Sequence, residues 1–363
     1  MMRAALALAR RSLGRTWPNP AVGCVVVRDG RVVARGRTQA GGRPHAEADA
    51  IAQAAALGIS LQGATAYVTL EPCSHHGRTP PCADALVAAG VAKVVSALED
   101  PDPRVKGRGH ERLRAAGVEV AVGEGAAEAA EINAGFLTRV KAGRPLFHLK
   151  IASSLDGRIA TATGESKWIT GPAARQHGHH LRALHDAILI GAETAMADNP
   201  DLGCRLPGLA DRSPLRIVLD SRARLSPQSR LAMTARQRPV WLLCTRAAPA
   251  SAREALASLG VEIVEVEAAA DGRIDVAGAG TVLGARGLTR VLIEGGGEIA
   301  ASFLKAGLVD RISSYRAGLL LGGDSRSAVG SLGLERLDFA PRLRLVSARQ
   351  MDGDTLETWN REA

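Results

Sequence analysis

One histidine, one glutamate and two cysteines in the first quarter of the sequence have types and spacing that suit a metal centre. His45 and Glu47 are separated by one residue, and Cys73 and Cys82 follow. One imidazole and two thiolates supply three ligands to zinc and leave the fourth tetrahedral position open for water, as in catalytic zinc sites. A nearby carboxylate can move protons to and from that water. We therefore predict that His45, Cys73 and Cys82 bind zinc and that Glu47 is catalytic.

Two helices are expected to position these side chains. Pro44 precedes a helix-like run that begins at His45, and Pro81 precedes a second run that begins at Cys82; proline is favoured at helix starts. The positive end of the helix dipole there favours a thiolate. Residues two apart on a regular helix do not share a face, so His45 and Glu47 must converge through the geometry of a first turn. H-x-E followed by P-C and a second cysteine is the signature of the zinc deaminases.

The cysteine spacing distinguishes this sequence from most such signatures. Eight residues separate the cysteines, Ser74 to Pro81, and they are polar, basic and proline-rich, which indicates a loop over the site. The segment EPCSHHGRTPPC resembles the deaminase half of the bifunctional riboflavin-biosynthesis deaminase-reductases. The resemblance implies hydrolytic deamination of a diamino-ribosylaminopyrimidinone phosphate, with the zinc ligands and proton shuttle as above. It also implies that Asn19 contacts the pyrimidine, while His75 and His76 either contact substrate or are solvent-exposed.

The second half of the sequence alternates strand-like and helix-like runs, which is typical of an α/β layer structure. One buried strand leads into Gly295-Gly296-Gly297 and then into a helix that begins near Glu298. Backbone N–H groups in such a turn can bind phosphate at the helix N-terminus, although a triple glycine is also compatible with a plain tight turn.

Four motifs in the second half resemble, in order, the reductase half of the same family. They are Lys150 to Gly157, Gly164 to Thr170, Gly191 to Thr194, and Asp198 to Pro200. The resemblance implies a dihydrofolate-reductase-like domain that binds NADPH and reduces the ribosyl group to ribityl. It implies cofactor contacts at Ala152, Trp168, Thr194, Asp198, Ser221, Gly296, Gly297, Glu298, Ile299, Ala300, Ala301 and Ser302. It implies substrate contacts at Ser166, Arg182, Leu202, Arg205 and Glu294.

Reduction of a sugar imine or aldehyde also needs a proton donor beside the nicotinamide. Lys150 and Glu294 are the candidate catalytic residues, because both are expected at strand ends and both can exchange protons; each can alternatively be a binding contact only. The two arginines of the substrate set suit a phosphate through their forked donors.

A length of 363 residues favours two domains, with Ala142-Gly143-Arg144-Pro145 as the hinge. We therefore expect an α/β protein with a deaminase domain at residues 1–143, cytidine-deaminase-like and three-layered, and a reductase domain at residues 144–363. The N-terminal run MMRAALALARRSLGRTW is expected to form a first amphipathic helix rather than a targeting peptide.

The formal net charge of +9 comes mainly from scattered arginines, which favours phosphorylated small molecules as substrates. Aromatic residues make up only 3%, and no dense basic tract is present, so nucleic acid is not an expected partner. No apolar run is long enough to span a membrane. Five cysteines, two of them assigned to zinc, argue against disulfides and for a cytoplasmic protein. A homo-oligomer is expected.

Two other interpretations stay open at this point. One is a nucleoside or nucleic-acid zinc deaminase fused to a reductase-like domain, and the other is a zinc-stabilised nucleotide-binding regulatory protein. The histidines at 177, 179, 180 and 185 could suggest a second metal site, but they lack carboxylate or thiol partners nearby, so we expect a solvated helix face.

Overall fold

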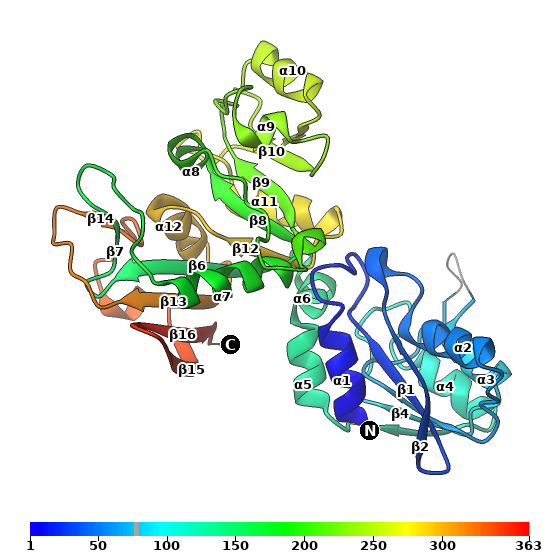
Figure 1. The fold of residues 1–363 in the computed structure, drawn as a ribbon. Coiled ribbons are helices and arrows are strands. Elements are labelled where there is room, and N and C mark those ends of the chain that lie inside the picture. The colour runs from blue at the N-terminus through cyan, green and yellow to red at the C-terminus, as the bar shows by residue number, and fades with distance from the viewer. Residues whose placement is uncertain (76–79, 363) are drawn as a thin grey trace. The chain divides into compact units, whose positions relative to one another are not determined.

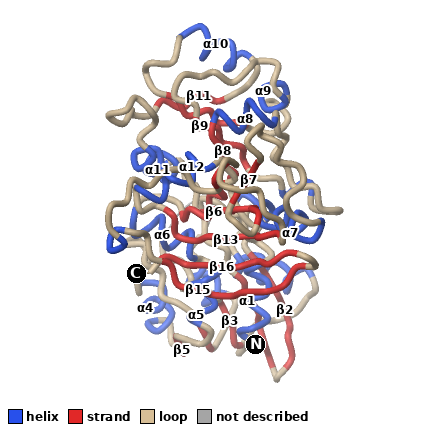
Figure 2. The backbone as a smooth tube through the Cα atoms, turned by 90° about the vertical axis from the view of Figure 1, so that its left-hand side faces the viewer, coloured by secondary structure: helices blue, strands red, loops and turns tan. Residues whose placement is uncertain are grey.

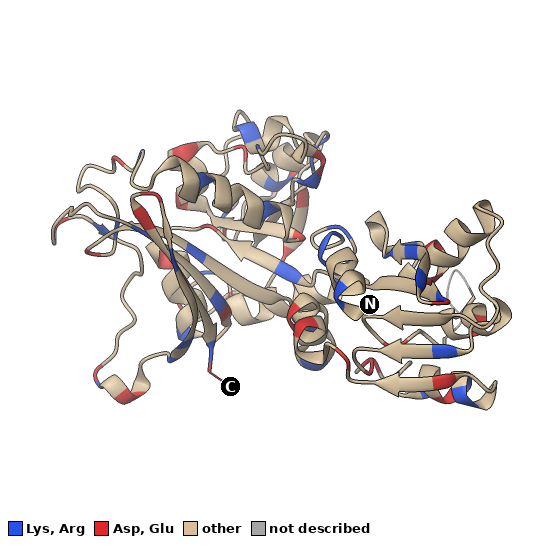
Figure 3. Ribbon diagram, turned by 60° about the horizontal axis from the view of Figure 1, so that its bottom comes forward, with Lys and Arg blue, Asp and Glu red and all other residues tan. Residues whose placement is uncertain are grey.

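The computed structural model describes residues 1–75 and 80–362. The chain forms two compact units, residues 1–143 and residues 144–363 (Figure 1). Within the described residues, no helix has both the length and the apolar character needed to cross a bilayer. Lysines and arginines are scattered over both units, with acidic residues among them (Figure 3).

The N-terminal unit is built on a five-stranded sheet with the order β2-β1-β3-β4-β5. β1 pairs antiparallel with both β2 and β3, whereas β3, β4 and β5 are parallel. The strands are β1 (Gly23–Arg28), β2 (Arg31–Arg37), β3 (Thr65–Val68), β4 (Lys93–Ser96) and β5 (Glu119–Val122). Because β3 and β4 are parallel neighbours, the loops that leave their carboxyl ends meet at one edge of the sheet.

Helices cover both faces of this sheet. The first helix, α1 (Met2–Arg10), packs with α5 (Ala126–Ile132) on one face, where Val25 and Val95 point. The other face carries α2 (Ala46–Ala56), α3 (Cys82–Ala88) and α4 (Arg108–Ala115), where Val26 and Val94 point. Side chains alternate along a strand, so consecutive valines serve the two cores. The three-layer arrangement is the one expected. A further helix, α6 (Ala134–Ala142), ends the unit.

The C-terminal unit is built on a nine-stranded sheet with the order β11-β10-β9-β8-β12-β6-β13-β16-β15. The pairs from β11 to β13 are parallel, and β16 and β15 add antiparallel strands at one edge (Figure 2). Its strands are β6 (Leu146–Ser154), β8 (Ala187–Gly191), β9 (Leu215–Leu219), β10 (Val240–Cys244), β11 (Glu262–Glu265), β12 (Arg290–Ile293), β13 (Val309–Ala317), β15 (Leu343–Met351) and β16 (Asp354–Arg361). Three of the segments singled out in the sequence lie on or directly after central strands: Lys150 to Gly157 at β6, Gly191 to Thr194 at β8, and Gly295 to Gly297 after β12.

Helices and short elements complete the C-terminal unit. The helices are α7 (Pro172–Ala183), α8 (Ala192–Asp198), α9 (Arg230–Met233), α10 (Ala250–Ser258), α11 (Val276–Ala285) and α12 (Gly297–Lys305), and β7 (Arg158–Ala160) pairs with β14 (Arg326–Ser327). Three 3₁₀ turns lie at Ala40–Gly42, Ala210–Arg212 and Leu337–Phe339. All five cysteines are free, and Cys24, Cys204 and Cys244 are buried.

The expectation of a solvated histidine face is wrong for His185, which is only 2% exposed. Its Nε2 lies 3.1 Å from Nδ1 of His148, and His148 Nε2 lies 2.9 Å from the Ser313 hydroxyl. His185 Nδ1 bonds the Leu181 carbonyl at 2.7 Å. The packing of α7 over β6 and β13 removes these rings from water, and the network satisfies their polar atoms.

This buried pair should make the C-terminal unit sensitive to acid. Burial lowers the pKa of His185 from 6.5 to about 3 and holds that of His148 well below its ordinary value. Both groups therefore take up a proton only on unfolding as the pH falls below 6.5. Above about pH 6.5 both rings are neutral in the folded and the unfolded chain, and their burial costs no stability. Between pH 6.5 and the lowered pKa of the folded state, each ring reduces the free energy of unfolding by about 1.4 kcal/mol for every unit that the pH falls.

Urea denaturation of the full chain between about pH 7.5 and 5, followed by tryptophan fluorescence, measures this slope. His185→Gln removes one titrating group, so the pH dependence should become shallower by about 1.4 kcal/mol per pH unit. An unchanged slope would contradict the burial argument.

Candidate functional site

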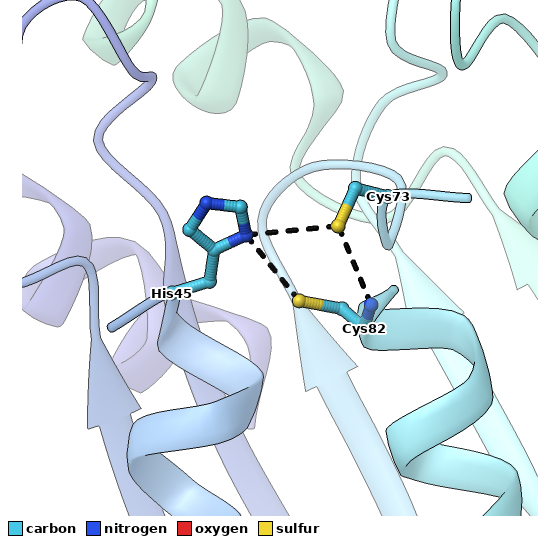
Figure 4. A group of neighbouring side chains, drawn as sticks. All are labelled: His45, Cys73 and Cys82. Carbon is cyan, nitrogen blue, oxygen red and sulfur yellow. Dashed lines mark hydrogen bonds between the residues drawn. The ribbon is translucent and has the colours of Figure 1, made fainter. Parts of the chain in front are cut away.

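The three predicted zinc ligands converge in the N-terminal unit (Figure 4). His45 immediately precedes α2, Cys73 lies in the loop after β3, and Cys82 is the first residue of α3. His45 Nδ1 lies 3.6 Å from Cys73 Sγ and 3.4 Å from Cys82 Sγ. A tetrahedral zinc with ordinary bond lengths would place nitrogen and sulfur about 3.5 Å apart. The donor set and its spacing therefore fit a zinc ion.

Electrostatics around the two sulfurs also fit a cation. The backbone N–H of Cys82, at the start of α3, donates to Cys73 Sγ at 3.3 Å. The hydrogen bond from the Cys82 thiol is the largest cause that lowers the pKa of Cys73, to about 4, while the pKa of Cys82 is raised in turn. One thiol thus stabilises the thiolate of the other, and a bound metal would stabilise both thiolates.

Glu47 lies in the first turn of α2 and is 4% exposed. Burial raises the pKa of this carboxyl to about 7, and its side chain is hydrogen-bonded to Cys82. His45 stands just outside the helix with extended backbone (φ −69°, ψ 162°), so its side chain is not bound to the helical spacing of α2. This geometry explains how residues two apart reach one site. A carboxyl that titrates near neutrality can both accept and donate a proton.

A pocket is lined by two of the three ligands, His45 and Cys73, and by Glu47. Its wall includes Asn19, which the sequence singled out and whose side-chain amide bonds the Gly42 carbonyl at 2.8 Å. His75 also lines the pocket, whereas His76 lies outside the described residues. The other lining side chains include Arg43, Asp100, Asp102, Arg104, Phe136 and Arg139.

The sequence analysis did not single out the three pocket arginines, 43, 104 and 139, because they come from separate segments. Arg43 lies before α2, Arg104 in the loop after β4, and Arg139 on α6. No short motif contains them. The one available signal was the turn-rich segment EDPDPRVKGRG, which places Arg104 after a strand end.

The C-terminal unit brings together the predicted residues Lys150, Arg182 and Glu294. Glu294 follows β12 and receives Arg182 through two hydrogen bonds, from Nε at 2.7 Å and from Nη2 at 2.9 Å. Lys150 Nζ, on β6, lies 3.8 Å from Glu294 Oε2. Burial would raise the pKa of Glu294, but Arg182 and Lys150 outweigh it and lower that pKa to about 2. Glu294 is therefore an ionised carboxylate between two cations.

The glycine turn between β12 and α12 lies at a helix N-terminus, and Gly297 there packs closely against the backbone of residues 327–330. A Cβ added to Gly297 would lie 2.6 Å from the Ser327 carbonyl oxygen, so a side chain does not fit there. The first N–H groups of α12 have no acceptor within the helix and favour an anion. Thr194, in the first turn of α8, faces this turn: its Oγ1 lies 3.7 Å from the position of a Cβ on Gly296. Thr194 and the start of α12 are therefore brought together at one helix N-terminus.

The other residues of α12 that the resemblance implies as cofactor contacts, Glu298 to Ser302, differ in burial and in hydrogen bonding. Glu298 is exposed and pairs with Arg273 at 3.1 Å, and Ile299 is half-buried. Ala300 and Ala301 are buried, and the Ala300 N–H bonds the Gly296 carbonyl at 3.2 Å. The Ser302 hydroxyl bonds the Glu298 carbonyl at 2.9 Å.

The other predicted cofactor residues are more widely distributed. Trp168 is 65% exposed, with the Arg175 guanidinium 4.6 Å from its ring centre. Asp198 is exposed at the end of α8, and Ala152 is half-buried on β6. The Ser221 hydroxyl accepts from the Ile274 N–H at 3.1 Å.

Among the predicted substrate residues, Leu202 is buried and Ser166 half-buried. Gly203, beside Leu202, accepts from Arg182 Nη1 at 3.0 Å, which links this loop to Glu294. Arg205 is exposed and contacts His179, with its Nε 3.1 Å from His179 Nε2.

Comparison with known proteins gives the context for both sites. The family model for the cytidine and deoxycytidylate deaminase zinc-binding region matches residues 1–98, and that for the RibD C-terminal domain matches residues 145–356. The riboflavin biosynthesis protein RibD of Escherichia coli (strain K12) is 42% identical over 366 residues, covering 97% of this chain and 96% of that protein.

Solved structures agree. Acinetobacter baumannii RibD (form 1) has a TM-score of 0.86 and 40% identity over 100% of this chain and 98% of its own. The Thermotoga maritima diaminohydroxyphosphoribosylaminopyrimidine deaminase/5-amino-6-(5-phosphoribosylamino)uracil reductase has a TM-score of 0.86 and 35% identity, covering 99% and 97% of the two chains. The expected fold classes, deaminase-like and reductase-like, are confirmed.

Proposed function

The chain belongs to the family of bifunctional riboflavin-biosynthesis deaminase-reductases, and from this we propose which of its residues carry each reaction. It is an enzyme that uses zinc and NADPH. We assign deamination of 2,5-diamino-6-ribosylamino-4(3H)-pyrimidinone 5′-phosphate to residues 1–143 and reduction of the ribosyl to a ribityl side chain to residues 144–363. A nucleoside or nucleic-acid zinc deaminase fused to a reductase-like domain and a zinc-stabilised regulatory protein are set aside, since the relatives that match nearly the whole chain are riboflavin-biosynthesis enzymes.

The observation that carries the deaminase assignment is the His45–Cys73–Cys82 cluster, of which His45 and Cys73 line one pocket together with Glu47. Zinc, when bound, supplies a Lewis acid that makes water a nucleophile near neutral pH. Glu47 accepts a proton from the attacking water and delivers it to the departing ammonia, which its buried carboxyl can do. Asn19 orients the pyrimidine from the opposite loop.

For the reductase, the cluster of Lys150, Arg182 and Glu294 is the proposed substrate end of the site. NADPH, when bound, supplies the hydride. The turn at Gly296 and Gly297 and the start of α12 hold its phosphates, with Thr194 at the neighbouring helix start. Arg182 and Arg205 bind substrate, and Lys150 supplies the proton, because the ionised Glu294 carboxylate has none to give.

We also propose a homo-oligomer in the cytoplasm. Strand β15 is an edge strand, and it exposes Leu345 by 45% and Val346 by 49%. An unprotected edge of this kind favours pairing with another chain. Five free cysteines favour a reducing compartment.

Mass spectrometry of the products tests the proposed function. With zinc and the diaminopyrimidinone substrate, we expect a gain of about one dalton as NH₂ becomes OH, and a further gain of about two daltons when NADPH is added. Removal of zinc with a chelator should abolish the first gain. Zinc-free enzyme given the deaminated intermediate should still reduce it, because the C-terminal unit holds its own site. A first gain that survives complete removal of zinc would contradict the assignment.

A further inference from the structure

Glu71, the first residue of the EPC segment, has no role in the chemistry described above. Its side chain is fully buried. Oε2 accepts from the backbone N–H groups of Asp100 and Gly107, both at 3.0 Å. Oε1 accepts from the N–H groups of Gly109 at 2.8 Å and His110 at 3.2 Å. One carboxylate therefore joins the loop that carries a zinc ligand to the segment that runs from residue 100 into α4.

These four bonds explain how an ionisable group is accommodated in the interior. A carboxylate gains charge-assisted hydrogen bonds from backbone N–H groups, and the N-terminal end of α4 adds a favourable dipole. The approach is close: a Cβ on Gly109 would lie 2.0 Å from the Pro72 carbonyl oxygen, so only glycine permits this packing. The four N–H groups require an acceptor with two oxygens, because each carboxylate oxygen of Glu71 accepts from a different pair of them.

The segment that Glu71 holds contributes one wall of the pocket. Asp100, Asp102 and Arg104 all line it. Asp102 accepts from Arg104 Nη2 at 2.6 Å and from the Arg104 N–H at 2.9 Å, so the turn is internally rigid. This turn is attached to the rest of the site in part by the two hydrogen bonds that the Asp100 and Gly107 N–H groups donate to Glu71. Glu71 lies two residues before the ligand Cys73.

We propose that Glu71 is a positioning residue for deamination, which holds the wall formed by residues 100–107 in register with the zinc ligands. The proposal rests on the assignment of this pocket to the deaminase. Because the wall lines the pocket but supplies none of the zinc ligands, its displacement should weaken substrate binding more than it slows the chemical step.

Glu71→Gln is the informative substitution, because it preserves shape but turns one acceptor oxygen into an NH₂ donor. Two backbone N–H groups then face a donor, whichever way the amide is turned. We expect KM for deamination to rise about tenfold or more, with kcat changed by less than about threefold, as a misplacement of binding groups predicts. Zinc content and NADPH-dependent reduction should be unchanged. Glu111→Gln, the same change at an exposed position of α4, is the matched control and should leave KM unchanged.

Hydrogen exchange of the full-length enzyme gives a readout independent of activity. The amides of Asp100, Gly107, Gly109 and His110 should exchange faster in Glu71→Gln than in the parent or in Glu111→Gln. A variant with normal KM overturns the proposal, even if its melting temperature is lower, since a purely structural residue would behave that way. Unchanged exchange at these amides would overturn it as well.

If Glu71→Gln is purified without zinc, its KM cannot test the proposal, and Gly109→Ala is the substitution to measure instead. It leaves the carboxylate in place and breaks the same junction from the other side, so the same rise in KM supports the proposal and an unchanged KM overturns it. A parent enzyme that does not deaminate would refute the assignment of the pocket itself, which is a different outcome.

Discussion

Glu47→Gln should lower kcat for deamination by about 10³-fold while the enzyme keeps its zinc and its reductase activity. The carboxyl is buried in the first turn of α2, is hydrogen-bonded to Cys82 and lines the pocket. Glutamine has nearly the same shape but can neither take a proton from water nor deliver one to the departing ammonia. The ligands themselves are unchanged, so metal content should be too.

The measurement is steady-state deamination with zinc quantified in the same preparation. Asp49→Asn is the matched control, because Asp49 lies on the same helix outside the pocket, where its carboxylate accepts from the Arg37 N–H at 3.0 Å and from Gln39 Nε2 at 2.9 Å. That variant should deaminate at nearly the parental rate. A Glu47→Gln enzyme that deaminates at the parental rate would show that the proton moves by another route.

Lys150→Met should lower kcat for reduction by about 10²-fold or more and leave deamination intact. The Lys150 side chain is 22% exposed, and its Nζ lies 3.8 Å from Glu294 Oε2. Glu294 is bound by Arg182, and its lowered pKa keeps it ionised at neutral pH, so it has no proton to donate and Lys150 is the candidate that remains. Methionine keeps the aliphatic length and removes that proton.

Reduction of the deaminated intermediate, followed by NADPH absorbance, measures this effect. Lys305→Met, at an exposed lysine at the end of α12, is the control and should be active. A parental kcat with a raised KM for the intermediate would instead make Lys150 a binding contact. In that case the proton would come from solvent or from the substrate.

The residue types and spacing in the sequence were sufficient to predict that His45, Cys73 and Cys82 lie together, and to predict the succession of strands and helices. This succeeded because proline at a helix start, glycine after a buried strand and alternating apolar residues act over a few positions. His45 and Cys82 each lie at such a start, so their geometry is local even though they are far apart in the chain.

Only the tertiary structure decided which distant residues meet. Lys150 reaches Glu294 because β6 and β12 pair with Leu149 opposite Ile293, a register that neither segment encodes alone. His185 is buried by the packing of α7 over β6 and β13, where its ring meets His148 of β6. The local sequence pattern suggested a solvated face, because it contains no sign of this contact with a distant strand. Glu71 bonds residues 100–110 because β3 and β4 are parallel neighbours with adjacent ends. Each case depends on a contact between segments brought together by the sheet, and the short patterns that could be read from the sequence contain no information about such pairings.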